Sequence, residues 1–135
     1  MMAAEIVAAA RAELDTRFVH QGRISGVALD CAGLIVQVAR SIGVSYTDVP
    51  AYGRSPHQGL LQATLDSNAC IERVTDHQAG DILLMRFASE PQHLAICAGD
   101  TMIHSYLQVG KVCEHRLSAV WAARIVGVYR FKDVA

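Results

Sequence analysis

The sequence predicts an α+β fold in which an apolar helix packs against an antiparallel β-sheet. Helical periodicity is confined to the first half of the 135-residue chain. From Gly80 onward the chain consists of short segments rich in Ile, Val, Leu, Phe and Tyr, separated by turn residues. Helices followed by a run of strands are typical of α+β proteins.

Two helices are expected before residue 43. Residues 3–16 form the first, because their apolar positions fall on one helical stripe: Ile6, Val7, Ala10 and Leu14. The second covers residues 31–42, between Asp30, which is a good N-cap, and Gly43, which suits the C′ position. Apolar residues surround most of this second helix, so we expect it to lie at the centre of the fold.

A third helix and five strands follow. Ser55-Pro56-His57-Gln58 has the pattern of a capping box with proline at the first helical position, and predicts a helix that ends near Ser67. A short helix from Ser118 to Ala123 should precede the last strand. The expected strands are 81–87, 93–98, 101–106, 111–116 and 125–131.

Composition and charge exclude several classes of protein. The 12 Lys and Arg residues against 13 Asp and Glu give a net charge of −1, whereas nucleic-acid binding needs a basic excess or patch. No segment reaches the ~20 apolar residues of a membrane span. The Ala-rich start lacks the basic region of a signal peptide, so we expect synthesis in the cytoplasm. The length fits a single domain over residues 1–135.

Cys31 is the candidate nucleophile. Capping by Asp30 places it at the first helical position, where unpaired N–H groups and the positive helix end favour a thiolate. The same N–H groups can face a developing oxyanion. The other cysteines are widely spaced without a CxxC pair and are expected to be reduced and structural: Cys70, Cys97 and Cys113.

His93 and His104 are the candidate partners of Cys31. A two-residue hairpin turn at Gly99-Asp100 would place both rings on one face of the hairpin, in a diagonal relation. This arrangement supplies a base, His93, and a group that orients it, His104. Two alternatives stay open: Cys31 is an ordinary core residue, or the three residues bind zinc. The remaining histidines are expected in loops or at the surface: His20, His57, His77 and His115.

Four short motifs, in the right order, resemble the NlpC-type cysteine peptidases, which are papain-like cell-wall hydrolases of bacteria. Asp30-Cys31-Ala32-Gly33-Leu34 is similar to the D-C-[SA]-G-[LF] motif of that family. The other three resemble its G-D, H-[VL]-[GA]-I and [FM]-I-H-[AS] strands, and they begin at Gly80, His93 and Met102. The resemblance extends from about residue 5 to residue 131.

The resemblance implies a circularly permuted papain-like fold, with the cysteine on a central helix near the N-terminus that packs against an antiparallel sheet. It implies hydrolysis of an amide in peptidoglycan stem peptides, often the bond between D-γ-glutamate and diaminopimelate. Cys31 would be the nucleophile, His93 the base and His104 the third polar residue. No cofactor is implied.

The oxyanion site departs from the family pattern. Many members carry a tyrosine about a dozen positions before the cysteine, and the nearest match here is Phe18, which has no hydroxyl. Gln21 and His20 are therefore the candidate donors to the oxyanion. Asp30 is grouped with them as a candidate oxyanion or substrate-binding residue.

Two further segments resemble a branch of the family that is carried by phages, prophages and gene-transfer particles. They are the His20-Gln21-Gly22-Arg23 loop and the segment from Arg116 to Phe131. This likeness implies a virion protein associated with the phage tail, with tail-tip proteins as partners and the cell wall as its site of action. The alternative is a structural tail-tip component with weak or no activity.

Overall fold

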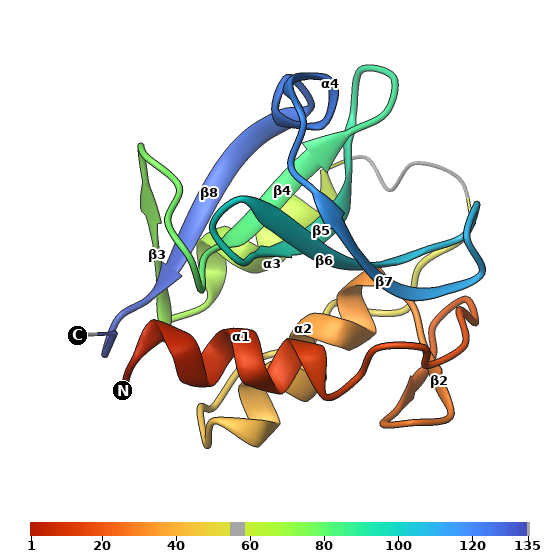
Figure 1. The fold of residues 1–135 in the computed structure, drawn as a ribbon, viewed down its shortest axis with the longest axis horizontal. Helices are drawn as coiled ribbons and strands as arrows, with labels where there is room; N and C mark the ends of the chain where they lie inside the picture. Colours follow the sequence, from red (N-terminus) through yellow and green to blue (C-terminus); the bar gives the residue numbers. More distant parts are fainter. Residues whose placement is uncertain (55–58, 135) are drawn as a thin grey trace.

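The computed structural model describes residues 1–54 and 59–134. Three helices lie along one face of a six-stranded antiparallel sheet, and a short fourth helix precedes the last strand (Figure 1). The helices are α1 Ala3–Arg11, α2 Cys31–Ser41, α3 Leu60–Ser67 and α4 Ala119–Ala122. The sheet has the order β3-β8-β4-β5-β6-β7. Its strands are β3 Ile71–Val74, β4 Ile82–Arg86, β5 Pro91–Cys97, β6 Thr101–Tyr106, β7 Lys111–Arg116 and β8 Ile125–Phe131.

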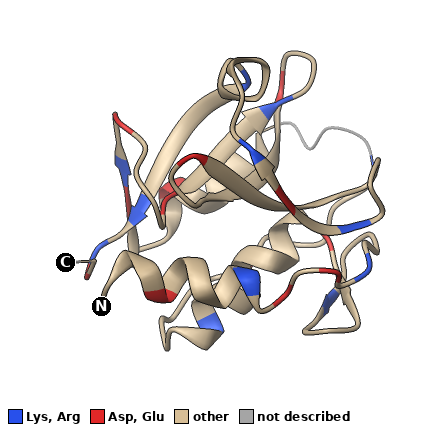
Figure 2. Cartoon of the chain, in the orientation of Figure 1, with Lys and Arg blue, Asp and Glu red and all other residues tan. Residues whose placement is uncertain are grey.

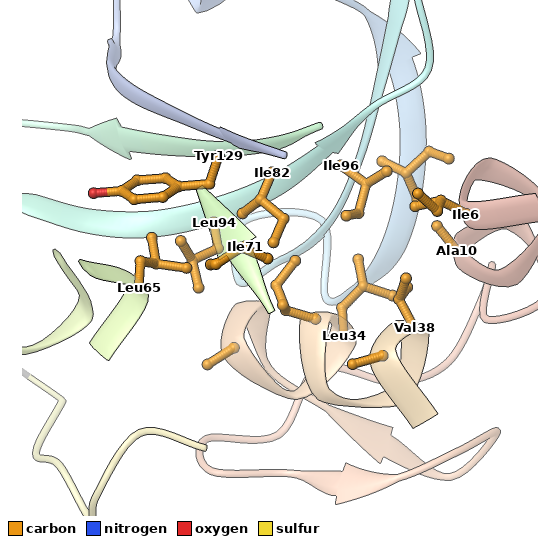
Figure 3. Packing of buried hydrophobic residues seen from close by; sticks show 14 of the residues in the cluster. Ile6, Ala10, Leu34, Val38, Leu65, Ile71, Ile82, Leu94, Ile96 and Tyr129 are labelled. Atoms are coloured by element: carbon orange, nitrogen blue, oxygen red, sulfur yellow. The ribbon is translucent and has the colours of Figure 1, made fainter. Parts of the chain in front are cut away.

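The α+β prediction is confirmed, and α2 is the central helix. The Asp30 side chain caps α2 by accepting from the N–H of Gly33, as the sequence predicts. Figure 3 shows Leu34 and Val38 of α2 among the buried residues that face the sheet. Burial of nearly the whole circumference explains why α2 has so few polar residues.

The first helix is shorter than predicted. It ends at Arg11, and Leu14 is 37% exposed instead of lying on the buried stripe. The chain turns away because its backbone pairs with β7: the N–H of Asp15 donates to the carbonyl of Val112, and the N–H of Val112 donates to the carbonyl of Thr16. Tertiary hydrogen bonds therefore end a segment that periodicity alone would continue.

The predicted strands are present within a residue or two, and three short ones were missed. The missed strands are β1 Arg23–Ile24, β2 Ala28–Leu29 and β3. The third helix ends at Ser67 as predicted, whereas the capping box at residues 55–58 lies outside the described residues. The hairpin turn is confirmed by the pairing of Cys97 with Met102, and Gly99 supplies the positive φ of +93°.

Successive side chains along the strands point to opposite faces of the sheet and pack into two separate hydrophobic clusters. On β5, Leu94 and Ile96 face the helices, whereas Ala95 and Cys97 join a smaller cluster on the opposite face. Trp121 of α4 packs against that smaller cluster. The second face of the sheet is therefore closed by the segment that leads into β8.

Charged residues are scattered over the fold. Figure 2 shows Lys and Arg interspersed with Asp and Glu over helices, strands and loops. None of the helices within residues 1–54 and 59–134 is long and apolar enough to cross a membrane.

Gly33 allows α2 to approach the preceding loop closely. A Cβ atom at this position would lie 2.1 Å from the carbonyl oxygen of Gly22, far inside van der Waals contact. The Gly22 carbonyl belongs to the backbone and cannot move away by a change of rotamer, as a side chain can. The glycine of the D-C-A-G motif is therefore required by packing.

We predict that Gly33→Ala lowers the free energy of unfolding by about 2 kcal/mol, the scale of overpacking in a core. The sign of this change in the free energy of unfolding tests the packing contact. Without the contact, alanine would stabilise the helix relative to glycine by about 1 kcal/mol. Urea unfolding of the purified protein measures the change. Gly53→Ala is the matched control, since a Cβ there meets no atom within 4 Å. Equal stability of Gly33→Ala and the wild type would contradict the packing argument.

Candidate active site

A cleft of about 450 Å³ lies beside the first turn of α2. Cys31 and His93 both line it, and so does Ser105 of β6. The buried Ser105 hydroxyl donates to the carbonyl of Leu29 at 2.6 Å, which ties β6 to the segment that enters α2. The size of the cleft is that of a small-molecule or peptide subsite.

The Asp30 carboxylate organises the start of α2. One oxygen accepts from the N–H of Gly33 and from Nη1 of Arg23, both at 2.8 Å. The other accepts from the N–H of Gln21 at 2.8 Å and from the hydroxyl of Tyr52. Asp30 is only 3% exposed, so these bonds replace its water. They extend the capping role predicted for Asp30, whereas its role as an oxyanion or substrate-binding residue stays a prediction.

Arg23 links this carboxylate to a second acidic residue. Its Nε donates to Asp48 at 2.8 Å, and its Nη2 donates to Asp48 at 3.2 Å and to the Tyr52 hydroxyl at 2.9 Å. The guanidinium thus joins the loop before α2 to the loop after it. Such a bidentate, charge-assisted contact fixes geometry as well as charge.

The surroundings of Cys31 favour the neutral thiol over the thiolate. Burial, reinforced by the neighbouring Asp30 carboxylate, raises the pKa of Cys31 to about 12. The backbone N–H groups of Leu94 and Ala32 lower the pKa of the thiol, but they are outweighed. Burial and Asp30 thus oppose the effect of the helix N-terminus on which the expected thiolate depends, and the thiolate stays a prediction. The contact from Leu94 also brings the start of β5, and with it His93, to Cys31.

The two candidate histidines touch, and a third continues the chain. His93 Nε2 lies 2.7 Å from His104 Nδ1, so the predicted closeness of the two rings is confirmed. His104 Nε2 lies 2.8 Å from His115 Nε2, and His115 Nδ1 lies 2.9 Å from the carbonyl oxygen of Arg116. The assignment of His115 to a loop or the surface is wrong, because it lies half-buried on β7 beside His104.

These three contacts permit one arrangement of protons for neutral rings. A carbonyl oxygen only accepts, so Nδ1 of His115 carries the proton and its Nε2 accepts from His104. His104 then carries its proton on Nε2, and its Nδ1 accepts from Nε2 of His93. Nδ1 of His93 is left with a lone pair. A single backbone carbonyl thus sets the tautomer of three rings.

Burial keeps the inner two rings uncharged. It lowers the pKa of His93 to about 3, and the positive charge of Arg124 acts in the same direction. It lowers the pKa of His104 to about 2, with a further contribution from His93. Aromatic side chains complete the surroundings: Tyr106 stacks on His104 at a centroid distance of 5.0 Å, and Trp121 meets its edge at 5.2 Å.

The two candidate oxyanion donors are placed differently. His20 lines the cleft, and its Nε2–H donates to the carbonyl of Tyr52 at 3.1 Å. Gln21 is exposed and is not among the residues that line the cleft; its side-chain amide donates to the same carbonyl. Phe18 lines the cleft, as the position of the family's tyrosine would suggest. The roles of His20 and Gln21 stay predictions.

The group of possible metal ligands in the structure shares only His104 with the zinc alternative of Cys31, His93 and His104. In the part of the chain that the structure describes, three ligand atoms within 4.8 Å of one another come from His104, Cys113 and His115. Cys31 is not part of that group. All four cysteines are free thiols, as the sequence predicts.

The comparison with protein families identifies the fold. The NlpC/P60 family matches residues 15–130, a range that contains the cleft and the three histidines. The chain belongs to the NlpC/P60 family. The resemblance of its motifs to NlpC-type proteins is thereby confirmed. No curated protein matches the sequence.

Solved structures of NlpC/P60 proteins share the fold. The NlpC/p60 domain of the peptidoglycan hydrolase SagA is 22% identical with a TM-score of 0.64, over 96% of this chain and 98% of that one. A lipoprotein-like NLP/P60 protein from Staphylococcus aureus is 20% identical with a TM-score of 0.68, over 96% and 41%. One from Bacillus cereus is 19% identical with a TM-score of 0.71, over 97% and 40%.

The chain thus spans about two-fifths of the length of the Staphylococcus and Bacillus proteins. At these identities the likeness concerns the fold. It confirms the predicted papain-like arrangement, in which the helix that begins at Cys31 packs against an antiparallel sheet.

The buried histidines make stability depend on pH. Each ring binds a proton in the unfolded chain below a pKa of about 6.5 but stays neutral when folded, so stability falls as the pH drops below that value. Between pH 6 and 4 we predict that His104→Gln reduces the slope of unfolding free energy against pH by about 1.4 kcal/mol per unit. Urea unfolding at several pH values measures the slope.

The exposed histidine His77 offers the matched control. The His77→Gln variant makes the same substitution at an exposed position and shows how far the exchange itself changes the slope. Identical slopes for His104→Gln and the wild type would show that the ring is protonated in the folded protein.

Proposed function

We propose that this NlpC/P60 domain is a cysteine peptidase that hydrolyses an amide bond in peptidoglycan stem peptides. The observation that carries the proposal is the shared cleft of Cys31 and His93, in which Nδ1 of His93 is left as the proton acceptor. Family membership and the similarity to the peptidoglycan hydrolase SagA support the substrate class.

Acylation starts from a neutral pair. As Sγ of Cys31 attacks the scissile carbonyl, His93 Nδ1 takes the thiol proton, so that charge develops only with the substrate in place. The Nε2–H of the resulting imidazolium still donates to His104. The N–H of Cys31, at the first position of α2, has no partner within the helix and faces the developing oxyanion.

Acylation is completed when His93 gives its proton to the leaving amine, which departs and leaves an acyl group on Cys31. In deacylation the ring accepts a proton from a water molecule, which attacks the acyl carbonyl. His93 then returns this proton to Sγ of Cys31 as the acid is released. Neither step needs a cofactor.

The bond between D-γ-glutamate and diaminopimelate is the proposed target. Stem peptides carry free carboxylates, and Arg54 lines the cleft as a cation that can bind one of them. We further propose a place in a phage tail, with tail-tip proteins as partners. The likeness of residues 20–23 and 116–131 to tail-associated members supports this.

A structural tail component with weak or no activity is the second candidate. Two observations favour it: Phe18 stands where many relatives have a tyrosine, and the pKa of the Cys31 thiol is raised. Turnover of a defined substrate separates the two candidates.

We predict that Cys31→Ala abolishes release of peptide fragments from purified muropeptides, because it removes the proposed nucleophile. Mass spectrometry of the products measures the activity and also identifies the bond. Cys70→Ser is the matched control and should retain wild-type activity, since Cys70 lies outside the cleft. Digestion by Cys31→Ala at the wild-type rate would refute the peptidase assignment.

We predict that His115 acts as a positioning residue. His115→Phe removes the acceptor for His104 Nε2–H, so the inner rings lose their single tautomer, and kcat should fall about tenfold or more while KM changes little. His115→Gln offers an amide oxygen in place of Nε2 and should recover part of the loss. Steady-state kinetics on a muropeptide test both. Equal kcat for His115→Phe and the wild type would exclude the role.

A further inference from the structure

We propose that His104, Cys113 and His115 form a binding site for a soft divalent cation of the zinc type, and that occupation of this site switches the peptidase off. The second part rests on the proposed function, whereas the first part does not. The site differs from the zinc alternative of the sequence analysis, with which it shares only His104, because it includes neither Cys31 nor His93.

The sheet brings the three ligands together on one face. His104 of β6 lies directly opposite Cys113 of β7, and His115 follows two residues later on the same side of β7. The three ligand atoms lie within 4.8 Å of one another. Because β7 is an edge strand and both of its ligands are half-buried, an ion can enter from solvent.

The donor set suits zinc. Imidazole nitrogen and thiolate sulfur are the ligands of structural and catalytic zinc sites, and three protein ligands leave a fourth position for water. His115 already has the outer hydrogen bond typical of a zinc-binding histidine, from Nδ1 to the carbonyl of Arg116, which aims Nε2 at His104. The two Nε2 atoms lie 2.8 Å apart and need to separate only to roughly 3.4 Å in a tetrahedral site.

An ion at this site is incompatible with the productive tautomer. Metal coordination uses the lone pair of His104 Nε2, which carries a proton in the unliganded chain of rings. That proton leaves to solvent, and His104 Nδ1 takes the proton of His93 Nε2. His93 in turn takes a proton from solvent on Nδ1. The nitrogen that should accept the thiol proton is then occupied.

Cobalt binding to the Cys31→Ala protein tests the site without reference to activity. Co²⁺ should give the near-ultraviolet charge-transfer absorption of a thiolate ligand, and Zn²⁺ should displace it. Adding Cys113→Ser should abolish this absorption, whereas adding Cys70→Ser should leave it intact. The site is overturned if the absorption is missing from the Cys31→Ala protein or persists after Cys113→Ser.

Zinc titration of muropeptide hydrolysis tests the switch. The wild type should lose activity on Zn²⁺ addition and recover it with chelator. Cys113→Ser should keep basal activity and need at least tenfold more Zn²⁺ for the same inhibition. Equal sensitivity of the two proteins would place the inhibitory ion at Cys31 and overturn the switch. If the wild type hydrolyses no muropeptide, the proposed function and the switch both fail, and the cobalt absorption still decides the site.

Discussion

The buried carboxylate of Asp30 holds together the segments that surround the start of α2. It caps the helix at Gly33, binds the backbone of the preceding loop at Gln21 and accepts from Tyr52 in the following loop. A carboxylate without water is costly unless a cation and hydrogen bonds compensate it, and Arg23 supplies the cation. The position of Cys31 at the mouth of the cleft therefore depends on a single side chain next to it.

The Asp30 carboxylate also affects the reactivity of the Cys31 sulfur. Burial of the thiol, reinforced by the negative charge of Asp30, raises the pKa of Cys31. The thiolate is therefore disfavoured at neutral pH. The proposed acylation therefore relies on a base near the sulfur. His93 lines the same cleft as Cys31, and the hydrogen-bonded rings leave its Nδ1 unprotonated.

Local signals in the sequence were sufficient for the main elements but not for their ends or for contacts between distant segments. Capping by Asp30 and the Gly99-Asp100 turn are encoded within a few residues, and both were predicted correctly. The end of α1 and the strand β3 depend on pairing with β7 and β8, some 60 to 100 residues away, and both were missed. Tyr52 reaches the site from a loop that carries no motif.

His115 could have been found from the hairpin register. Continuing the alternation from His104 to β7 places residues 113 and 115 on the same face, but a histidine near a strand end gives no signal on its own.

The Arg116 carbonyl determines the tautomers of the three rings although it lies at the edge of the sheet. Because a carbonyl oxygen can only accept, it gives the chain of three rings a direction, from Nδ1 of His93 to the edge of the sheet. A carboxylate at position 104 would stabilise an imidazolium more strongly, but it would bury a charge; the neutral ring fixes the base at a lower desolvation cost.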